Sequence, residues 1–131
     1  MCGLFGIYSQ KNDISKIIYL GLQALQHRGQ EGAGIAVLND KQITCYKKLG
    51  LLSEIFSKEM IDSLKGNIGV GHTRYSTTGS FNEINTQPIV SSWGNSPLAL
   101  AHNGNLTNSI ELRRELENKG VKFNTSMDSE I

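Results

Sequence analysis

The sequence predicts an α+β domain, because short apolar segments rich in β-forming residues alternate with amphipathic segments of helical spacing. Two pairs of the short segments flank turn-forming residues, which is typical of β-hairpins and hence of antiparallel pairing. The chain has 131 residues and fits one domain. A domain of this size buries roughly two thirds of its unfolded surface, so it needs neither a metal nor a disulfide to form a core.

The first predicted strand carries a cysteine at its tip. Residues Gly3–Ser9 (GLFGIYS) are short, apolar and rich in β-formers, which predicts a buried strand that begins directly after Cys2. Apolar residues then recur at three- and four-residue steps over Asp13–Gln26. This spacing predicts an amphipathic helix, with Asn12 or Asp13 as its N-cap.

The middle of the chain predicts a hairpin, a short helix and a further strand. Residues 35–39 and 42–47 flank a turn-forming Asn-Asp-Lys and predict the hairpin, in which Cys45 is a small buried residue. Residues Ser57–Lys65 carry apolar side chains on one helical face. Residues Asn67–Thr73 (NIGVGHT) predict a strand whose glycines permit close contact with its backbone.

The last third predicts a second hairpin and a second long helix. Residues 88–92 and 97–102 flank Trp-Gly-Asn-Ser, and the second of these strands is expected to be buried. A capping box that begins at Asn108 predicts a helix ending near Lys119. Residues 121–125 predict a short strand.

The first residues combine a nucleophile with a base. Methionine is removed before a small residue, so the mature chain is expected to begin with Cys2, which then carries a thiol and a free α-amino group. The ordinary pKa of an α-amine is about 7.7 to 8.0 and that of a cysteine thiol about 8.5. Near neutral pH the neutral amine can therefore accept the thiol proton, directly or through one water. A cysteine at position 2 is also common by chance, so this pattern alone decides nothing.

Two further segments place polar groups at predicted strand ends. Arg74 follows a strand among hydroxyl residues, where its planar guanidinium suits a carboxylate. Asn103 and Gly104 follow the last hairpin strand and offer an amide and a flexible N–H as converging donors, the parts of an oxyanion hole. An ordinary surface arginine and an ordinary Asn-Gly turn are the competing interpretations.

Charge and composition exclude several classes of partner. Lys and Arg number 13 and Asp and Glu number 12, without a long run of either sign. This balance gives no electrostatic footprint for nucleic acid or an anionic membrane. Neither a membrane-spanning apolar run nor a secretory signal is evident, so we expect a cytoplasmic protein with free thiols.

Five segments together resemble the glutaminase domain of the amidophosphoribosyltransferases, which are class II glutamine amidotransferases with an N-terminal nucleophile. The resemblance covers essentially the whole chain, in the order of the family, and each segment alone is weak. The segments are Cys2–Gly6, Gly21–Glu31, Gly71–Gly79, Ala101–Asn108 and Asp128–Glu130. The resemblance implies an N-terminal-nucleophile hydrolase fold, an αββα sandwich of antiparallel sheets between helices, which is incomplete in this chain.

The same resemblance implies the roles of individual residues. Cys2 would attack the side-chain amide of glutamine, and Asn103 and Gly104 would hold the oxyanion. The remaining implied residues bind or surround the substrate. They are Arg74 for the α-carboxylate, Asp128 for the α-ammonium, Arg28 on a closing loop, Tyr75 and Ser76 as lining, and His72 as support.

The resemblance also implies what lies outside this sequence. Residues 1–131 would form a partial type-2 glutamine amidotransferase domain, and the family's phosphoribosyltransferase domain is absent. The ammonia would convert phosphoribosyl pyrophosphate (PRPP) to phosphoribosylamine in the missing domain, within a homo-oligomer. No cofactor or metal is expected here; Mg and, as an open alternative, an iron–sulfur cluster belong to the C-terminal part. A shortened sheet would expose an edge, so we expect marginal stability or altered assembly.

Three other interpretations stay open. The domain could serve another acceptor, as in glucosamine-6-phosphate synthase, or bind glutamine without turnover. A metal site could use the side chains of Cys2, His27, His72 and His102, although their spacing is unlike that of structural zinc. Met127 departs from the small hydroxyl residue usual before Asp128, and a retained Met1 would lock the proposed base in a peptide bond.

Overall fold

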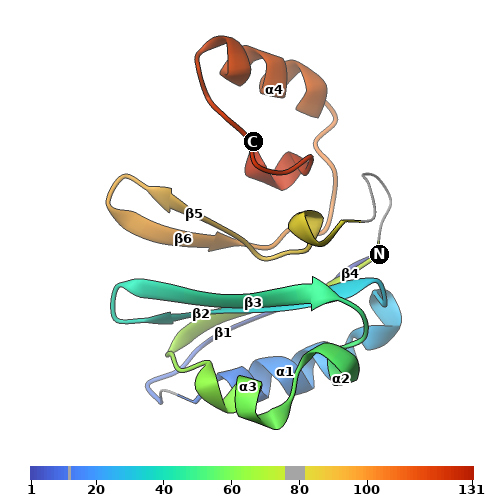
Figure 1. The fold of residues 1–131 in the computed structure, drawn as a ribbon, viewed down its shortest axis with the longest axis vertical. Coiled ribbons are helices and arrows are strands. Elements are labelled where there is room, and N and C mark those ends of the chain that lie inside the picture. Colours follow the sequence, from blue (N-terminus) through green and yellow to red (C-terminus); the bar gives the residue numbers. More distant parts are fainter. Residues whose placement is uncertain (12, 76–81) are drawn as a thin grey trace.

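A computed structural model describes residues 1–11, 13–75 and 82–131 and arranges them in layers (Figure 1). A four-stranded sheet carries helices on one face and a two-stranded sheet on the other, and a further helix lies beyond the second sheet. Within the described residues the strands are β1 (Gly3–Tyr8), β2 (Gly32–Asn39), β3 (Gln42–Leu49), β4 (Ile68–Arg74), β5 (Ile89–Trp93) and β6 (Ser96–Leu100).

The helices are short, and most of them lie against the larger sheet. The α-helices are α1 (Ser15–Ala24), α2 (Leu52–Ile55), α3 (Lys58–Ser63) and α4 (Ser109–Asn118). Three single 3₁₀ turns are η1 (Gln26–Arg28), η2 (Glu83–Asn85) and η3 (Asp128–Glu130). No helix among these residues is long and apolar enough to span a membrane.

The larger sheet is antiparallel, with the strand order β1-β4-β2-β3. Its register places Gly3 opposite Thr73 and Gly32 opposite Arg74. The start of β1, the end of β4 and the start of β2 therefore meet at one edge of the sheet. This edge holds Cys2 beside Arg74, which are 72 positions apart in the sequence.

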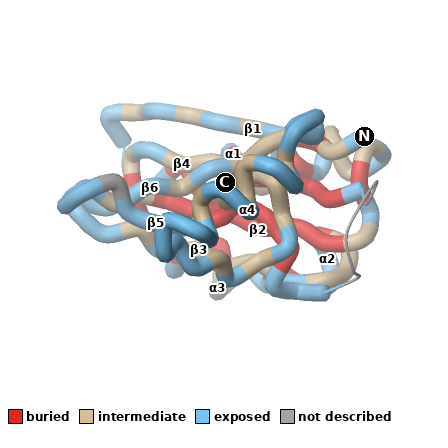
Figure 2. The backbone as a smooth tube through the Cα atoms, turned by 90° about the horizontal axis from the view of Figure 1, so that it is seen from above, coloured by how far each residue is buried: buried red, intermediate tan, exposed pale blue. Residues whose placement is uncertain are grey.

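The core lies between this sheet and α1. Ile14, Ile18 and Leu22 recur along one face of the helical segment and are fully buried. They pack on Gly69 and Gly71 of β4, where an added Cβ would come within 2.6 Å of Ile18 side-chain atoms. The glycines thus let the helix approach the sheet closely, as the sequence predicted. In Figure 2 the buried residues concentrate along β2, an interior strand of the larger sheet, which has helices on one face and the β5–β6 hairpin on the other.

The second layer is more open than the first. β5 and β6 form an antiparallel hairpin, and β6 alternates between exposed and half-buried residues. α4 lies beyond this hairpin in Figure 1, and none of its residues is buried. The second sheet therefore contributes little core of its own within the described residues.

Most predicted elements are confirmed, and the differences have local causes. Both hairpins, the helix after residue 13 and the helix after Asn108 form close to their predicted positions. The predicted burial of the first strand is wrong, because β1 is an edge strand whose Leu4 and Tyr8 face outward. The predicted capping box at Asn108 does not form, since its side chain makes no cap hydrogen bond.

Two further predictions about elements are wrong. Residues 121–125 are irregular and not a strand, because Glu130 accepts hydrogen bonds from the backbone N–H groups of Asn124 and Thr125 at 2.7 and 2.6 Å. The burial expected for the last hairpin strand is absent, with Leu98 and Leu100 each 42% exposed. The N-cap of α1 is Ile14, without a side-chain bond, and the alternative Asn12 lies outside the described residues.

Candidate active site

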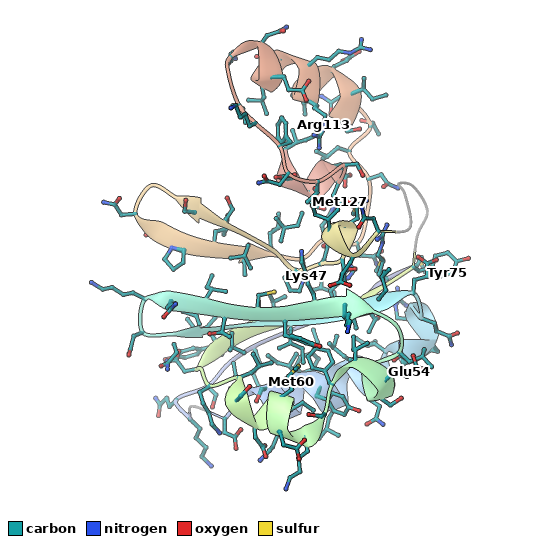
Figure 3. All side chains as sticks on the ribbon, viewed as in Figure 1. Lys47, Glu54, Met60, Tyr75, Arg113 and Met127 are labelled. Atoms are coloured by element: carbon teal, nitrogen blue, oxygen red, sulfur yellow. The ribbon has the colours of Figure 1, made fainter. Side chains whose placement is uncertain are left out.

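A cleft of about 260 Å³ opens at the edge of the larger sheet where β1 and β4 meet. Most of the residues that the sequence singled out line it, and they come from both sheets. The lining residues are Met1, Cys2, His72, Arg74, Tyr75, Gln87, His102, Asn103, Gly104, Asn105 and Met127. Figure 3 shows Tyr75 near the end of β4 and Met127 in the C-terminal segment above it.

Cys2 is held at the tip of β1 by a hydrogen bond that its own backbone carbonyl accepts and by one that the N–H of Gly3 donates. The Gly3 N–H donates to Thr73 Oγ1 at 3.1 Å, and Arg28 Nε donates to the Cys2 carbonyl at 3.0 Å. The Cys2 Sγ lies 3.4 Å from the Tyr75 N–H and 3.5 Å from the Tyr75 carbonyl. The N–H can donate to a thiolate and the carbonyl can accept from a thiol, so both protonation states have a partner.

Arg74 ends β4 in a buried position, with 3% of its surface exposed. Its Nη1 donates to the Asn82 carbonyl at 3.2 Å. The backbone of Gly29 packs against that of Arg74 so closely that a Cβ at Gly29 would lie 2.6 Å from the Arg74 carbonyl. Because burial removes water from the guanidinium, its charge favours the binding of an anion in the cleft that it lines.

His72 lies at the base of the cleft and is fully buried. Burial lowers its pKa from 6.5 to about 4, because desolvation disfavours the charged ring more than the nearby His102 backbone favours it. Arg74 and His102 lower the pKa further. Within the described residues neither ring nitrogen has a hydrogen-bond partner of good geometry. The imidazole is therefore neutral at pH 7.

Asn103 and Gly104 follow β6 and reach the cleft from the second sheet. Both are exposed, and the Asn103 amide has no hydrogen-bond partner among the described residues. A Cβ at position 104 would lie 2.7 Å from His102 Nε2, so a larger residue there would require the His102 ring to shift. An amide side chain and an adjacent glycine backbone thus line the same cleft as Cys2.

Asp128 is placed differently from the other predicted site residues. It lines a neighbouring groove of about 650 Å³ beside α4, while Met127 lines the cleft itself. Its Oδ2 accepts a hydrogen bond from the Leu106 N–H at 2.6 Å, and its Oδ1 lies 4.0 Å from His102 Nδ1. In this structure the carboxylate therefore holds the loop that carries Asn103.

The remaining predicted residues divide into three cases. Tyr75 lines the cleft and is 52% exposed. Arg28 contacts the Cys2 carbonyl but does not line the cleft. Ser76 lies outside the described residues.

The alternative of a metal site is not supported by the arrangement of its residues. His27 is exposed and His72 is buried, and the described part of the chain contains no group of three or more side chains arranged as metal ligands.

The sequence analysis missed Gln87, which lines the cleft and is 2% exposed. Its Oε1 accepts from the His102 N–H at 2.6 Å, and its Nε2 donates to the His102 carbonyl at 3.2 Å. The signal that could have found it is the predicted hairpin of residues 88–92 and 97–102, whose register continues to place position 87 opposite position 102.

Comparison with known proteins gives consistent matches. A family profile described as "Glutamine amidotransferase domain" matches residues 58–131. The chain is 57% identical to the amidophosphoribosyltransferase of Methanocaldococcus jannaschii and aligns over 100% of its own length and 28% of the relative. It is 47% identical to that of Lacticaseibacillus casei, over 99% of this chain and 67% of the relative.

Solved structures match over nearly the whole chain. One is the glutamine PRPP amidotransferase of Bacillus subtilis complexed with ADP and GMP, with a TM-score of 0.88 and 45% identity. It is matched over 98% of this chain and 28% of its own length. A structure described as the allosteric regulatory enzyme of purine biosynthesis matches with the same TM-score, identity and coverage. The chain therefore spans little more than a quarter of the proteins it matches in these cases.

Proposed function

Since the chain belongs to the amidophosphoribosyltransferase family of glutamine amidotransferases, we propose that it hydrolyses the side-chain amide of glutamine with Cys2 as the nucleophile. The observation that carries this proposal is the cleft itself, which is lined by a thiol, a buried guanidinium and a side-chain amide that come from two sheets. Family membership also confirms the predicted fold, the N-terminal-nucleophile hydrolase sandwich.

The first step requires a free α-amine on Cys2. Met1 precedes it in the structure and is 71% exposed, so the bond between the two residues is accessible to an aminopeptidase. Once Met1 is removed, the amine accepts the thiol proton, and the thiolate attacks the amide carbon of glutamine. The Tyr75 N–H, 3.4 Å from the sulfur, stabilises the thiolate before attack.

The attack moves negative charge onto the former carbonyl oxygen of the substrate. The Asn103 amide and the Gly104 N–H are proposed to hold this oxyanion. Support for Asn103 comes from its amide, which has no hydrogen-bond partner among the described residues, and support for Gly104 comes from its place beside Asn103 in the lining of the cleft. Donors fixed before the reaction stabilise the charge without reorganising, which is the usual source of such rate enhancement.

The intermediate then collapses. The carbon–nitrogen bond breaks, and the ammonium form of the Cys2 amine returns its proton to the departing nitrogen, which leaves as ammonia. The product is a γ-glutamyl thioester on Cys2. Water, deprotonated by the same amine, adds to the thioester carbon, and the carbon–sulfur bond breaks to give glutamate and the free thiol.

Arg74 is proposed to bind the α-carboxylate of glutamine. Its burial and its position at the end of β4 support this role, because a guanidinium excluded from water discriminates strongly for an anion. Asp128 is proposed to bind the α-ammonium through its carboxylate, which holds the Leu106 N–H through Oδ2 and the Ser129 hydroxyl through Oδ1. Tyr75 and Ser76 would line the site, His72 would support it, and Arg28 would close over it.

The whole protein is proposed to use the ammonia. The relatives of known name are amidophosphoribosyltransferases, so PRPP is the proposed acceptor and phosphoribosylamine the proposed product. A homo-oligomer is the proposed assembly. In this proposal, the chain releases the ammonia from glutamine, and the rest of the protein transfers it to PRPP.

The test compares the two cysteines. Cys2→Ser, in protein whose Met1 has been removed, should lower glutamate release from glutamine to background. Cys45→Ser is the matched control and should retain parental activity, because the Cys45 thiol is half-buried and burial raises its pKa. Measurement is by coupled glutamate assay. Activity that survives in Cys2→Ser and disappears in Cys45→Ser would reject the proposal.

A further inference from the structure

The proposed nucleophile and the proposed oxyanion donors stand on different sheets. Cys2 precedes β1 of the four-stranded sheet, whereas Asn103 and Gly104 follow β6 of the two-stranded sheet. An oxyanion hole functions only when its donors are fixed to within a fraction of an ångström of the developing charge. Some contact must therefore fix one sheet relative to the other.

Gln87 takes part in such a contact through its backbone, while its side chain extends the pairing of β5 with β6. It belongs to the segment that connects η2 to β5, and its side-chain amide bonds to the backbone N–H and carbonyl of His102, the residue directly before Asn103. The amide uses both of its ends: Oε1 accepts from the His102 N–H at 2.6 Å, and Nε2 donates to the His102 carbonyl at 3.2 Å. Two bonds from one planar group fix the orientation of the His102 backbone as well as its distance.

The backbone of Gln87 is itself held by the larger sheet. Gly34 of β2 and Lys47 of β3 are paired in register. A Cβ at Gly34 would collide with the Gln87 carbonyl oxygen, so the segment is seated directly on β2. Lys47 Nζ donates to the Pro88 carbonyl at 3.2 Å, and Figure 3 shows its side chain between the two sheets. Gln87 thus connects the sheet of the nucleophile with the loop of the donors.

We propose that Gln87 is a positioning residue, which holds the His102–Gly104 loop in register with Cys2 so that the Asn103 and Gly104 donors meet the oxyanion. The inference rests on the proposed function for its catalytic consequence. Its structural part, the fixing of the loop, does not depend on that function. Gln87 touches neither the substrate nor the reacting atoms in this account, and it acts through His102.

The test replaces the Gln87 side chain with one of similar volume that lacks the amide. Gln87→Met, in the full chain with Met1 removed, loses both bonds to His102. Backbone hydrogen exchange at His102 should become at least about tenfold faster. The kcat for glutamine hydrolysis should fall at least about tenfold, part of the hundred- to thousandfold that one oxyanion donor supplies. The KM should change less than about threefold, because Arg74 is untouched.

The control is Thr86→Val. Thr86 is the buried neighbour in the same segment, and its Oγ1 has no hydrogen-bond partner among the described residues. It should leave kcat and His102 exchange within about twofold of the parent. Alkylation of Cys2 by iodoacetamide should proceed at the parental rate in both variants, since the thiol itself is not altered.

The outcomes separate the two proposals. Faster His102 exchange with a lower kcat in Gln87→Met supports the inference, and parental exchange or a parental kcat overturns it. If the parent releases no glutamate, the proposed function fails, and the exchange measurement alone decides whether Gln87 fixes the loop. Should Gln87→Met not fold, Gln87→Glu replaces it, because it keeps the volume and one acceptor oxygen but lacks the NH₂ donor; the same two criteria apply.

Discussion

Arg74 is the buried side chain that we propose binds the α-carboxylate of glutamine. Because a guanidinium binds a carboxylate through two parallel N–H donors and an ammonium does not, Arg74→Lys keeps the charge and loses the geometry. We expect the KM for glutamine to rise at least about tenfold with a kcat within about threefold of the parent. Steady-state kinetics measure both, and Arg114→Lys on the exposed side of α4 is the control. A parental KM in Arg74→Lys would remove the residue from carboxylate binding.

His72 makes the stability of the fold depend on pH. Its pKa is about 4 in the folded chain and about 6.5 when unfolded, so between these values the unfolded state binds more protons. The free energy of unfolding should therefore be level above about pH 6.5 and fall as the pH is lowered toward 4. This group alone accounts for a loss of about 2 kcal/mol between pH 7 and pH 5.

Urea unfolding at the two pH values measures the effect. His72→Gln, which cannot titrate, should remove about that much of the pH dependence, whatever its own stability. His27→Gln, at an exposed histidine, should keep the parental dependence. An equal pH dependence in parent and His72→Gln would show that the ring is not buried in its neutral form.

Single residues differ in how far their roles could be predicted from the sequence. Cys2, Arg74 and Asn103 lie at ends of predicted strands, where side chains of unusual chemistry indicate a site, and all three line the cleft. Gln87 was not singled out, because a glutamine side chain carries no unusual chemistry and its role depends on the His102 backbone, which the pairing of β5 with β6 brings opposite it.

At the scale of elements, the approach of α1 to β4 determines the stability of the sheet that carries Cys2. A Cβ at Gly71 would lie 2.6 Å from Ile18 Cγ2 and 2.7 Å from Leu22 Cδ1. Because these side chains are fully buried and cannot retreat, Gly71→Ala should lower the free energy of unfolding by about 1 to 3 kcal/mol.

The control for this prediction lies on the neighbouring strand. Gly6 is exposed, and the nearest atom to an added Cβ is the Gly69 carbonyl oxygen at 4.0 Å. Gly6→Ala should therefore change stability by less than about 0.5 kcal/mol. Denaturant unfolding compares the two. Equal effects of the two substitutions would contradict the close packing of α1 on β4.

Elements were predictable where the pattern was local and long. The ten residues of α1 show their apolar period in the sequence, and both hairpins are marked by their turns. α2 has four residues, too few to show a period, and was missed. The segment 121–125 has β-forming residues but pairs with the Glu130 carboxylate, a competitor that propensity does not register.

At the scale of the whole molecule, the site exists only because two layers meet. The larger sheet supplies Cys2 and Arg74, and the connection after the smaller sheet supplies Asn103 and Gly104. The sequence indicated these residues by resemblance to a family, and the comparisons confirmed the family and its fold. Their distances could not be predicted, because no local pattern records how two sheets are stacked.

The smaller sheet exposes apolar side chains that a complete sandwich would cover. Val90, Leu98 and Leu100 are each more than 40% exposed. Within the described residues, β5 and β6 pair only with each other. The sequence analysis predicted that the isolated chain associates through an exposed sheet edge, and this stays a prediction.

Cys2, freed from Met1, is the residue that we propose reacts with glutamine. The most direct measurement treats the chain with an electrophilic glutamine analogue, before and after removal of Met1, and locates the adduct by peptide mass spectrometry. We expect an adduct on Cys2 in the processed chain alone, and we expect excess glutamine to suppress it. An adduct on Cys45, or equal labelling of Cys2 in the chain that retains Met1, would contradict it.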